Sequence, residues 1–300
     1  MTTRLLSDLA LARMKIGIIG IGAIGSVLSL SLQESNELFY FNRSKREKLS
    51  VENSGVIENR EIVLSDFNIR EKLDWLIICI KEYHIEGAIQ SIIKLIHPEI
   101  KIAVIRNGLD LKRPYIDYLD EENILECIID CPTQINPNGG YIQYNVPRIL
   151  TSVNKNFKEF KALFQKSRIE INETRDFHTE KWKKIIESSS LGGLLSVMND
   201  TCKVFQDVKT IELYKKVVEE GINVAIADGA DIQHDFKDTL MNKLLTYPST
   251  KGSSMLTDRI NGRPIEWNAK NGIISRIGKQ KGMKTDLNDL LCLLLRRINV

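Results

Sequence analysis

Residues 17–26 of this chain are GIIGIGAIGS, and three of the four glycines, Gly20, Gly22 and Gly25, constrain its fold more than any other stretch. They follow the apolar run KIGIIG over 15–20, which predicts a buried parallel strand. They precede AIGSVLSLSLQES, whose apolar spacing predicts a helix. In such a unit the first glycine permits a tight turn, the second lets the backbone approach a pyrophosphate, and the third lets helix and strand pack closely. The stretch therefore predicts a dinucleotide-binding loop, with a purely structural glycine turn as the alternative. The residues of the predicted loop are Gly20, Gly22, Ala23, Ile24 and Gly25.

The end of the next strand candidate, LFYFNR over 38–43, indicates which dinucleotide binds. A site selective for NAD usually carries Asp or Glu about 20 residues after the glycines, where the carboxylate binds the ribose hydroxyls. Here Asn42 and Arg43 stand at that place, and there is no acid. Arg43 can pair with a 2′-phosphate, helped by Lys45 or Arg46, whereas a carboxylate would repel it. These residues predict NADP(H); the alternative is that the basic side chains are a solvated helix start.

Strand and helix candidates alternate through the first half of the chain. Apolar runs over 74–80, 101–105 and 123–130 predict buried strands, and the amphipathic stretch 82–96 predicts a helix. This alternation predicts a parallel sheet covered on both faces. After the turn-rich NPNGG, we expect YIQYNV (141–146) and RILTSV (148–153) to form an antiparallel pair, followed by a helix over 156–167 and a strand over 168–173.

From about residue 176 the pattern changes, because every apolar run recurs at intervals of three or four residues. The second half is therefore predicted to be helical. Three hundred residues suit two modest domains. We expect an N-terminal extension over 1–13, a dinucleotide-binding domain over 14–175, and a helical substrate and catalytic domain over 176–300.

Composition excludes several classes of protein. A net charge of +3, from 42 basic and 39 acidic residues, gives no reason to expect nucleic acid or a membrane surface as a partner. No apolar run approaches the ~20 residues of a membrane span. The five cysteines lie mostly in apolar runs and are spaced unlike a metal site, so we expect buried thiols and no metal. The first thirteen residues lack the features of a secretion signal, which favours a cytoplasmic protein.

Several separated motifs, taken together with the glycine loop, resemble the ketopantoate reductase family, which reduces 2-dehydropantoate with NADPH on the route to pantothenate and coenzyme A. The motifs are IKEYH (80–84), IRNGLD (105–110), EKWKK (180–184) and SSMLTDRINGRPIEWNAKNG (253–272). The resemblance implies an α/β fold with an N-terminal Rossmann domain and a C-terminal all-α domain of the 6-phosphogluconate dehydrogenase-like type. It also implies a small 2-oxo acid substrate bound between the domains. The helical half could pair with a second copy.

The resemblance also implies a role for individual residues. Lys184 matches the catalytic lysine, Glu266 the glutamate that orients lysine and substrate, and Ser254 the contact to the substrate carboxylate. Asn107 and Lys81 match the pair that reaches substrate and cofactor from the first domain, and Arg43 matches the 2′-phosphate ligand. The chemistry is consistent, because hydride arriving at a 2-oxo carbon leaves negative charge on oxygen that a lysine ammonium can stabilise and protonate.

Each of these residues also has a purely structural interpretation. Without the matched motifs, Lys184 would be a solvated helix residue and Glu266 a surface carboxylate. Ser254 would be a loop hydroxyl or a helix N-cap, and Asn107 the first residue of an Asn-Gly turn. The four histidines match no motif and are expected to be structural or exposed.

The chain departs from the family pattern after the lysine. The family usually has two substrate-binding asparagines four and eight residues further on, and here Ser188 and Gly192 occupy those places. Ser188 could still bind substrate with a shorter reach, but Gly192 has no side chain. A buried polar group that loses its partner is costly, so a change here alters which substrate fits. The hypotheses are therefore reduction of 2-dehydropantoate by NADPH, reduction of another 2-oxo acid, carbonyl or imine by a paralogous enzyme, and a non-enzymatic NADP-binding sensor.

Overall fold

The computed structural model describes residues 13–298, so the expected extension over 1–13 lies, apart from Arg13, outside the described residues. Seven strands form one sheet in the order β11-β10-β7-β6-β5-β1-β2. Its strands are β1 (Lys15–Ile19), β2 (Glu37–Phe41), β5 (Trp75–Ile78), β6 (Lys101–Ile105), β7 (Ile124–Asp130), β10 (Arg148–Ser152) and β11 (Glu170–Thr174). The five strands from β7 to β2 are mutually parallel, and β10 pairs antiparallel with β7.

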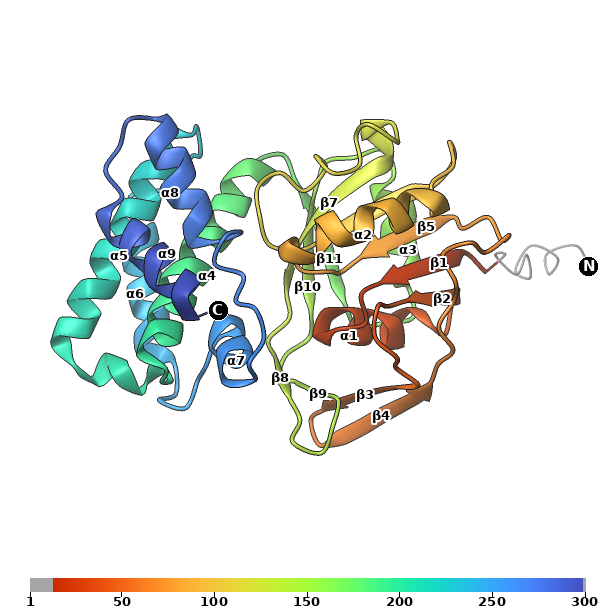
Figure 1. Cartoon of the computed structure of the whole chain (residues 1–300), viewed down its shortest axis with the longest axis horizontal. Coiled ribbons are helices and arrows are strands. Elements are labelled where there is room, and N and C mark those ends of the chain that lie inside the picture. Colours follow the sequence, from red (N-terminus) through yellow and green to blue (C-terminus); the bar gives the residue numbers. More distant parts are fainter. Residues whose placement is uncertain (1–12, 299–300) are drawn as a thin grey trace, which may run out of the picture.

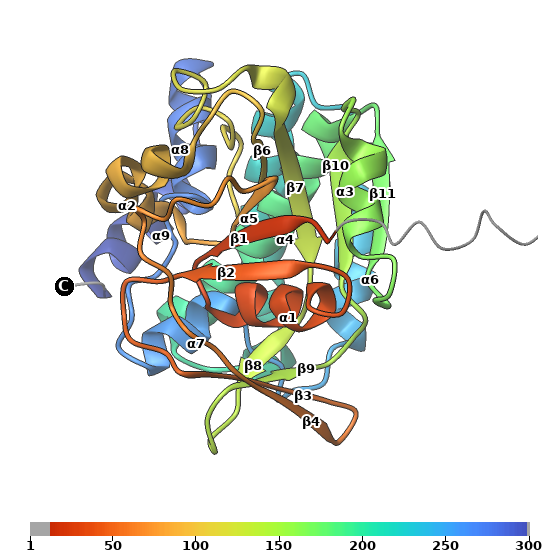
Figure 2. The ribbon, with the colours of Figure 1, turned by 90° about the vertical axis from the view of Figure 1, so that its right-hand side faces the viewer.

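Helices cover both faces of this sheet, because its central strands carry apolar side chains on both sides. The covering helices are α1 (Ala23–Leu32), α2 (Ile85–Ile92) and α3 (Phe157–Leu163). Ile16 and Ile18 of β1 belong to the core shared with α1 and α3, whereas Ile19 and Ile78 belong to the core shared with α2. Figure 2 shows α1 and α2 on opposite sides of β1 and β2. The predicted α/β fold with a doubly covered parallel sheet is confirmed.

A second, four-stranded sheet lies beside α1 (Figures 1 and 2). Its strands, in spatial order, are β4 (Val56–Glu61), β3 (Lys48–Asn53), β9 (Tyr141–Gln143) and β8 (Thr133–Ile135). Neither β3 nor β4 was predicted from the sequence. Every residue of β4 is exposed, so this strand lacks the alternation of buried and exposed positions by which a strand is recognised.

The predicted pairing of 141–146 with 148–153 is wrong. β9 pairs antiparallel with β8 and parallel with β3, while β10 pairs with β7 and β11 in the large sheet. Ile149 and Thr151 of β10 are buried, and their alternation matches the large sheet. Alternation identifies a strand but not the strand that it joins, which depends on where the chain can bury that face.

The second half of the described chain is helical and contains no strand after Thr174, as predicted. Its α-helices are α4 (Phe177–Met198), α5 (Val208–Ala227), α6 (Phe236–Thr246), α7 (Ser254–Ile260), α8 (Asn271–Gln280) and α9 (Asp286–Ile298). Short 3₁₀ turns occur at Glu82–His84 (η1), Ile93–Leu95 (η2), Glu121–Asn123 (η3) and Cys202–Gln206 (η4). The long helix α4 lies at the centre of the helical half, and its Trp182 and Ile186 are fully buried in that core.

Between residues 13 and 298, no helix combines the length and the apolar character needed to cross a membrane. All five cysteines are free thiols; Cys127 and Cys202 are buried and the others are partly buried.

Replacing Gly25 tests the close packing of the glycine loop. An alanine Cβ at this position would lie 2.0 Å from the carbonyl oxygen of Gly20, so α1 and the loop would have to separate. We expect Gly25→Ala to lower the free energy of unfolding by about 2 kcal/mol or more, measured by urea denaturation. Gly22→Ala is the matched control, because a Cβ there meets no atom within 4 Å. Equal stability of the two variants would contradict this packing role.

Candidate active site

The glycine loop lies at the carboxyl end of β1, between that strand and α1. Gly20 has a φ of +90°, which favours glycine, and its N–H donates to the carbonyl of Phe41 at 3.0 Å. The backbone at Gly22 is open, because an added Cβ would have no neighbour within 4 Å. The N-cap residue of α1 is Gly22, which has no side chain to cap the N–H groups at the start of the helix. An open backbone and uncapped N–H groups fit the pyrophosphate of a dinucleotide.

The end of β2 adds a basic side chain to the same edge of the sheet. Asn42, at the place of the ribose-binding acid, accepts a hydrogen bond from the N–H of Ile21 at 3.2 Å. Arg46 donates to the carbonyl of Ile21 at 2.6 Å and lies over the ring of Tyr141, so it is engaged in the structure. Arg43 is exposed and has no hydrogen bond or ion pair among the described residues. Arg43 is therefore the arginine of this segment that is available to a 2′-phosphate.

Glu266 joins the helical half to the carboxyl ends of β5 and β6. It is buried, with an exposed fraction of 5%. Its Oε1 accepts from the backbone N–H of Glu82, at the start of η1, at 3.2 Å. Its Oε2 accepts from the side-chain amide of Asn107, just after β6, at 3.0 Å. The structure therefore brings Asn107 and Glu266 together, as their expected roles require.

Lys81, just after β5, makes a second connection between the two halves. Its ammonium forms a hydrogen-bonded ion pair with Asp258 of α7. Burial raises the pKa of Asp258 above its ordinary value, although the neighbouring Lys81 acts in the opposite direction. Lys81 therefore reaches the region between the halves, with its charge directed at a carboxylate of the helical half.

Lys184 projects from α4 toward the end of β7. Its Nζ lies 3.1 Å from Oδ1 of Asp130, the last residue of that strand. Burial raises the pKa of Asp130, but the charge and hydrogen bond of Lys184, together with the charges of Lys243 and Arg148, outweigh burial, and the pKa lies below its ordinary value. The helix is anchored near this point by Trp182, whose indole N–H donates to Asp228 at 3.1 Å. The neighbouring Lys183 instead pairs with Glu180 on the same helix.

Ser254 and Lys270 complete the cluster. Ser253, rather than Ser254, is the N-cap of α7, and its hydroxyl accepts from the N–H of Leu256 at 3.1 Å. Ser254 is exposed, and its Oγ accepts a hydrogen bond from Nζ of Lys270 at 3.2 Å. Lys270 itself is 3% exposed. Burial lowers its pKa from the ordinary 10.5 to about 8, with a further lowering by Lys81 and Lys184 and an opposing effect of Glu266 and Asp258.

Ser188 and Gly192, the two positions that depart from the family pattern, offer little hydrogen bonding to a ligand. The hydroxyl of Ser188 donates to the carbonyl of Ile185 on its own helix at 3.3 Å. At Gly192, an added Cβ would lie 2.7 Å from the sulfur of Met255, which is fully buried. The thioether of Met255 therefore fills the space that a side chain at position 192 would need. The close contact of α4 with α7 depends on this glycine.

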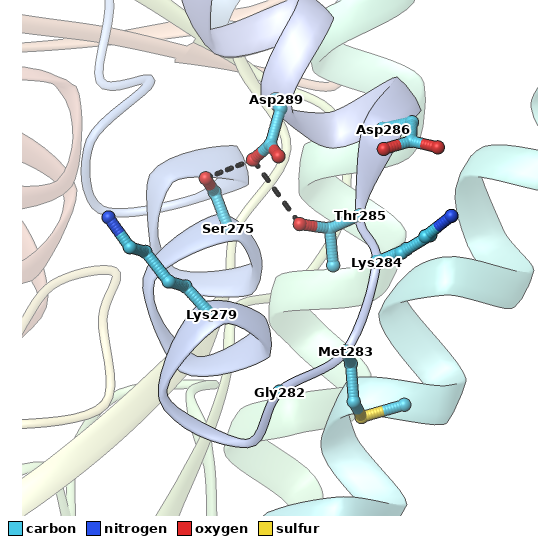
Figure 3. A pocket seen from close by; sticks show the side chains of 8 residues that line it. All are labelled: Ser275, Lys279, Gly282, Met283, Lys284, Thr285, Asp286 and Asp289. Atoms are coloured by element: carbon cyan, nitrogen blue, oxygen red, sulfur yellow. Dashed lines mark hydrogen bonds between the residues drawn. The ribbon is translucent and has the colours of Figure 1, made fainter.

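A separate hollow lies between α8 and α9, with a volume of about 550 Å³ (Figure 3). Figure 3 shows that Ser275 and Thr285 both direct their hydroxyls at Asp289, so these polar groups satisfy one another. None of the residues lining it belongs to the glycine loop or to the cluster around Glu266. The hollow is therefore separate from the glycine loop and from the cluster around Glu266.

Three members of the cluster were not identified from the sequence: Asp130, Asp258 and Lys270. Asp258 and Lys270 lie inside the SSML to NAKNG block, whose matched spacing was the available signal. Lys270 has the sequence context of a surface lysine, and its burial is visible only in the folded structure. Asp130 follows an apolar strand, so its position at a carboxyl end was the available signal.

Two family models match the chain: "Ketopantoate reductase PanE/ApbA" over residues 16–146 and "Ketopantoate reductase PanE/ApbA C terminal" over residues 176–299. The chain belongs to the ketopantoate reductase family. A 2-dehydropantoate 2-reductase of Caulobacter vibrioides is 26% identical over 283 residues, covering 93% of this chain and 97% of that protein. The resemblance stated from the motifs is confirmed, and the chain is an oxidoreductase of this family.

Solved structures of similar proteins have the same fold. A dimeric ketopantoate reductase from Staphylococcus aureus superposes with a TM-score of 0.85 at 21% identity, covering 95% of this chain and 99% of that chain. A D-mandelate dehydrogenase in complex with NADH and anilino(oxo)acetate gives a TM-score of 0.84 at 21% identity, covering 95% and 98%. At these identities the likeness establishes the Rossmann and all-α architecture and leaves the substrate to be argued from the site.

The buried Lys270 predicts a pH-dependent cost in stability. In the unfolded chain its pKa returns to the ordinary 10.5, so between about pH 8 and 10.5 the unfolded state binds more protons and this group makes stability rise with pH. We expect Lys270→Met to be more stable than wild type at pH 7, because the buried charge is removed. The gain should shrink as pH rises from 8 toward 10.5, measured by urea denaturation at each pH.

The matched control is Lys279→Met, which makes the same substitution at an exposed position of α8. It should change stability by less than about 0.5 kcal/mol at every pH. A Lys270→Met protein that is less stable than wild type at pH 7 would show that Lys270 stabilises the fold, contrary to this expectation.

Proposed function

We propose that this protein reduces a 2-oxo acid with NADPH, with Lys184 as the proton donor. The leading substrate is 2-dehydropantoate, reduced to pantoate on the route to pantothenate and coenzyme A. The observation that carries the proposal is that Lys184 and the Asn107–Glu266 pair lie at the carboxyl ends of neighbouring parallel strands, on the same edge as the glycine loop. The proposal divides the chain into a cofactor domain over 14–175 and a catalytic domain over 176–300.

The site residues have distinct tasks in this reaction. Bound NADPH supplies the hydride. The ammonium of Lys184 stabilises the negative charge on the carbonyl oxygen and donates the proton. Glu266 fixes Asn107 through the 3.0 Å hydrogen bond, so that the amide is held at the substrate position. Ser254 binds the substrate carboxylate, and Asp130 holds Lys184 at the end of β7.

In this proposal the cofactor binds at the carboxyl ends of β1 and β2, on the same edge of the large sheet. Gly20, Gly22 and Gly25 bring the backbone close to the pyrophosphate, together with the N–H groups of Ala23 and Ile24 at the start of α1. The exposed guanidinium of Arg43 pairs with the 2′-phosphate. Burial and then the charges of Arg43 and Lys81 lower the pKa of His84, which supports a position of Arg43 near η1.

A second candidate substrate is a 2-oxo acid without a side-chain hydroxyl. The contact between Gly192 and Met255 favours it, because a thioether occupies the place of a hydrogen-bonding side chain. Ser188, whose hydroxyl already donates to its own helix, offers only a short reach. A substrate hydroxyl directed there would lose its hydrogen bonds to water without full replacement.

Loss of the Lys184 ammonium should abolish most of the activity. We expect Lys184→Ala to lower kcat/KM by ~10²-fold or more in an NADPH-oxidation assay across a panel of 2-oxo acids that includes 2-dehydropantoate. Lys183→Ala is the control, because this neighbouring lysine pairs with Glu180 and should remain near wild-type activity. Wild-type protein that binds NADPH tightly but turns over no 2-oxo acid would refute the proposal and favour a sensor.

The preference for NADPH should depend on Arg43. A charge-assisted hydrogen bond to phosphate contributes about 1.5–3 kcal/mol, so we expect Arg43→Ala to weaken NADPH binding roughly 10- to 100-fold. NADH lacks the 2′-phosphate, and its dissociation constant should change less than about twofold. Both constants can be measured by cofactor fluorescence. An equal effect on the two cofactors would reject the role of Arg43.

A further inference from the structure

Lys270 is a buried cation without a carboxylate partner in the described chain. Its Nζ makes one hydrogen bond, to the hydroxyl of Ser254, whereas an ammonium has three N–H donors. Among residues 13–298, no carboxylate oxygen lies within the 4.0 Å of an ion pair with this ammonium. The nearest acids are engaged elsewhere: Glu266 accepts from Asn107 and a backbone N–H, and Asp258 pairs with Lys81.

Burying a cation that has no carboxylate partner is costly, because its hydration is lost without a paired charge in exchange. The charged groups that act on Lys270 come from every element around it: Lys81 after β5, Lys184 on α4, Asp258 on α7 and Glu266 before α8. Two of them are further lysines, which disfavour the ammonium. In the described part of the chain, the ammonium of Lys270 has one hydrogen-bond partner, the hydroxyl of the exposed residue Ser254. The ammonium of Lys270 therefore lies behind the hydroxyl of Ser254, and this hydroxyl can contact a ligand.

We propose that Lys270 and Ser254 form an anion-binding pair, in which Lys270 positions and polarises the Ser254 hydroxyl that receives the carboxylate of the substrate. This inference rests on the proposed reduction of a 2-oxo acid. Lys270 occupies an acceptor lone pair of the serine oxygen, which leaves the O–H to donate outward. A hydroxyl polarised by a cation is a stronger donor than an isolated one, because hydrogen bonds in a chain strengthen one another.

The pair also bears on which part of the substrate determines specificity. The carboxylate end meets a hydroxyl backed by a buried charge, whereas the positions of Ser188 and Gly192 offer little polar contact. The site therefore recognises the 2-oxo acid group itself more than polar groups on the substrate side chain. Lys270 acts through Ser254, so we assign it as a positioning residue.

Binding of oxamate, an unreactive 2-oxo acid mimic, to the NADPH complex tests this pair. We expect Lys270→Met to weaken oxamate binding about tenfold or more and to change NADPH binding by less than twofold, both followed by NADPH fluorescence. Wild-type affinity for oxamate should fall as pH rises through about 8, where Lys270 loses its proton. Lys270→Met should lack this dependence, and Lys270→Arg, which stays charged, should bind oxamate without it.

Two further variants separate positioning from general damage. Ser254→Ala should weaken oxamate binding, and adding Lys270→Met to it should have little further effect, because both residues act through one hydroxyl. The control Lys279→Met should bind oxamate as the wild type does. Additive losses would contradict action through Ser254.

The outcomes distinguish this inference from the proposed function. If Lys270→Met binds oxamate within twofold of wild type, or keeps the same pH dependence, the anion-binding pair is refuted and the reductase proposal stands. If the wild-type NADPH complex binds inorganic sulfate, with loss in Lys270→Met, but does not bind oxamate, the pair is supported and the 2-oxo acid function falls. Binding of neither anion refutes both.

Discussion

One buried carboxylate, that of Glu266, holds the helical half against the carboxyl edge of the large sheet. It accepts hydrogen bonds from the N–H of Glu82 after β5 and from the amide of Asn107 after β6. Hydrogen bonds to a charged group contribute about 1.5–3 kcal/mol, and neither donor belongs to the helical half. The position of Lys184 relative to the glycine loop therefore depends on Glu266, which also orients the side chain of Asn107.

The cluster around Glu266 concentrates charge at the boundary between the halves. Lys81 and Lys184 are paired with Asp258 and Asp130, so much of the cost of bringing them together is offset within the protein. Lys270 differs, because it is buried with a neutral hydroxyl as its partner. A protein selected only for stability would place an apolar side chain there. In our proposal the residue that we expect to lower stability is also the one that gives the site its affinity for an anion.

Several elements were predictable because their signal is local. The strand, the glycine spacing and the helix of residues 15–32 define the loop by backbone conformation and close packing, as the 2.0 Å approach at Gly25 shows. The pairing of β9 and β10 was not predictable, because alternation does not specify a partner. Lys270 and Asp130 were missed for a related reason: the burial of Lys270, and the contact of Asp130 with Lys184, depend on residues distant in sequence.

The sequence by itself determined the strands of the large sheet, the helical character of the second half, the dinucleotide loop, the absence of an acid at the end of β2 and the lysine of α4, because each follows from short-range spacing or residue type. Only the tertiary structure decided which groups meet at the carboxyl edge. The Asn107–Glu266 hydrogen bond joins residues 159 positions apart, and the Lys81–Asp258 pair joins residues 177 apart. It also decided that Met255 fills the space beside Gly192 and that Lys270 is buried behind Ser254. These contacts arise from helix packing, which brings distant side chains within van der Waals and hydrogen-bond distance, and no local pattern encodes them.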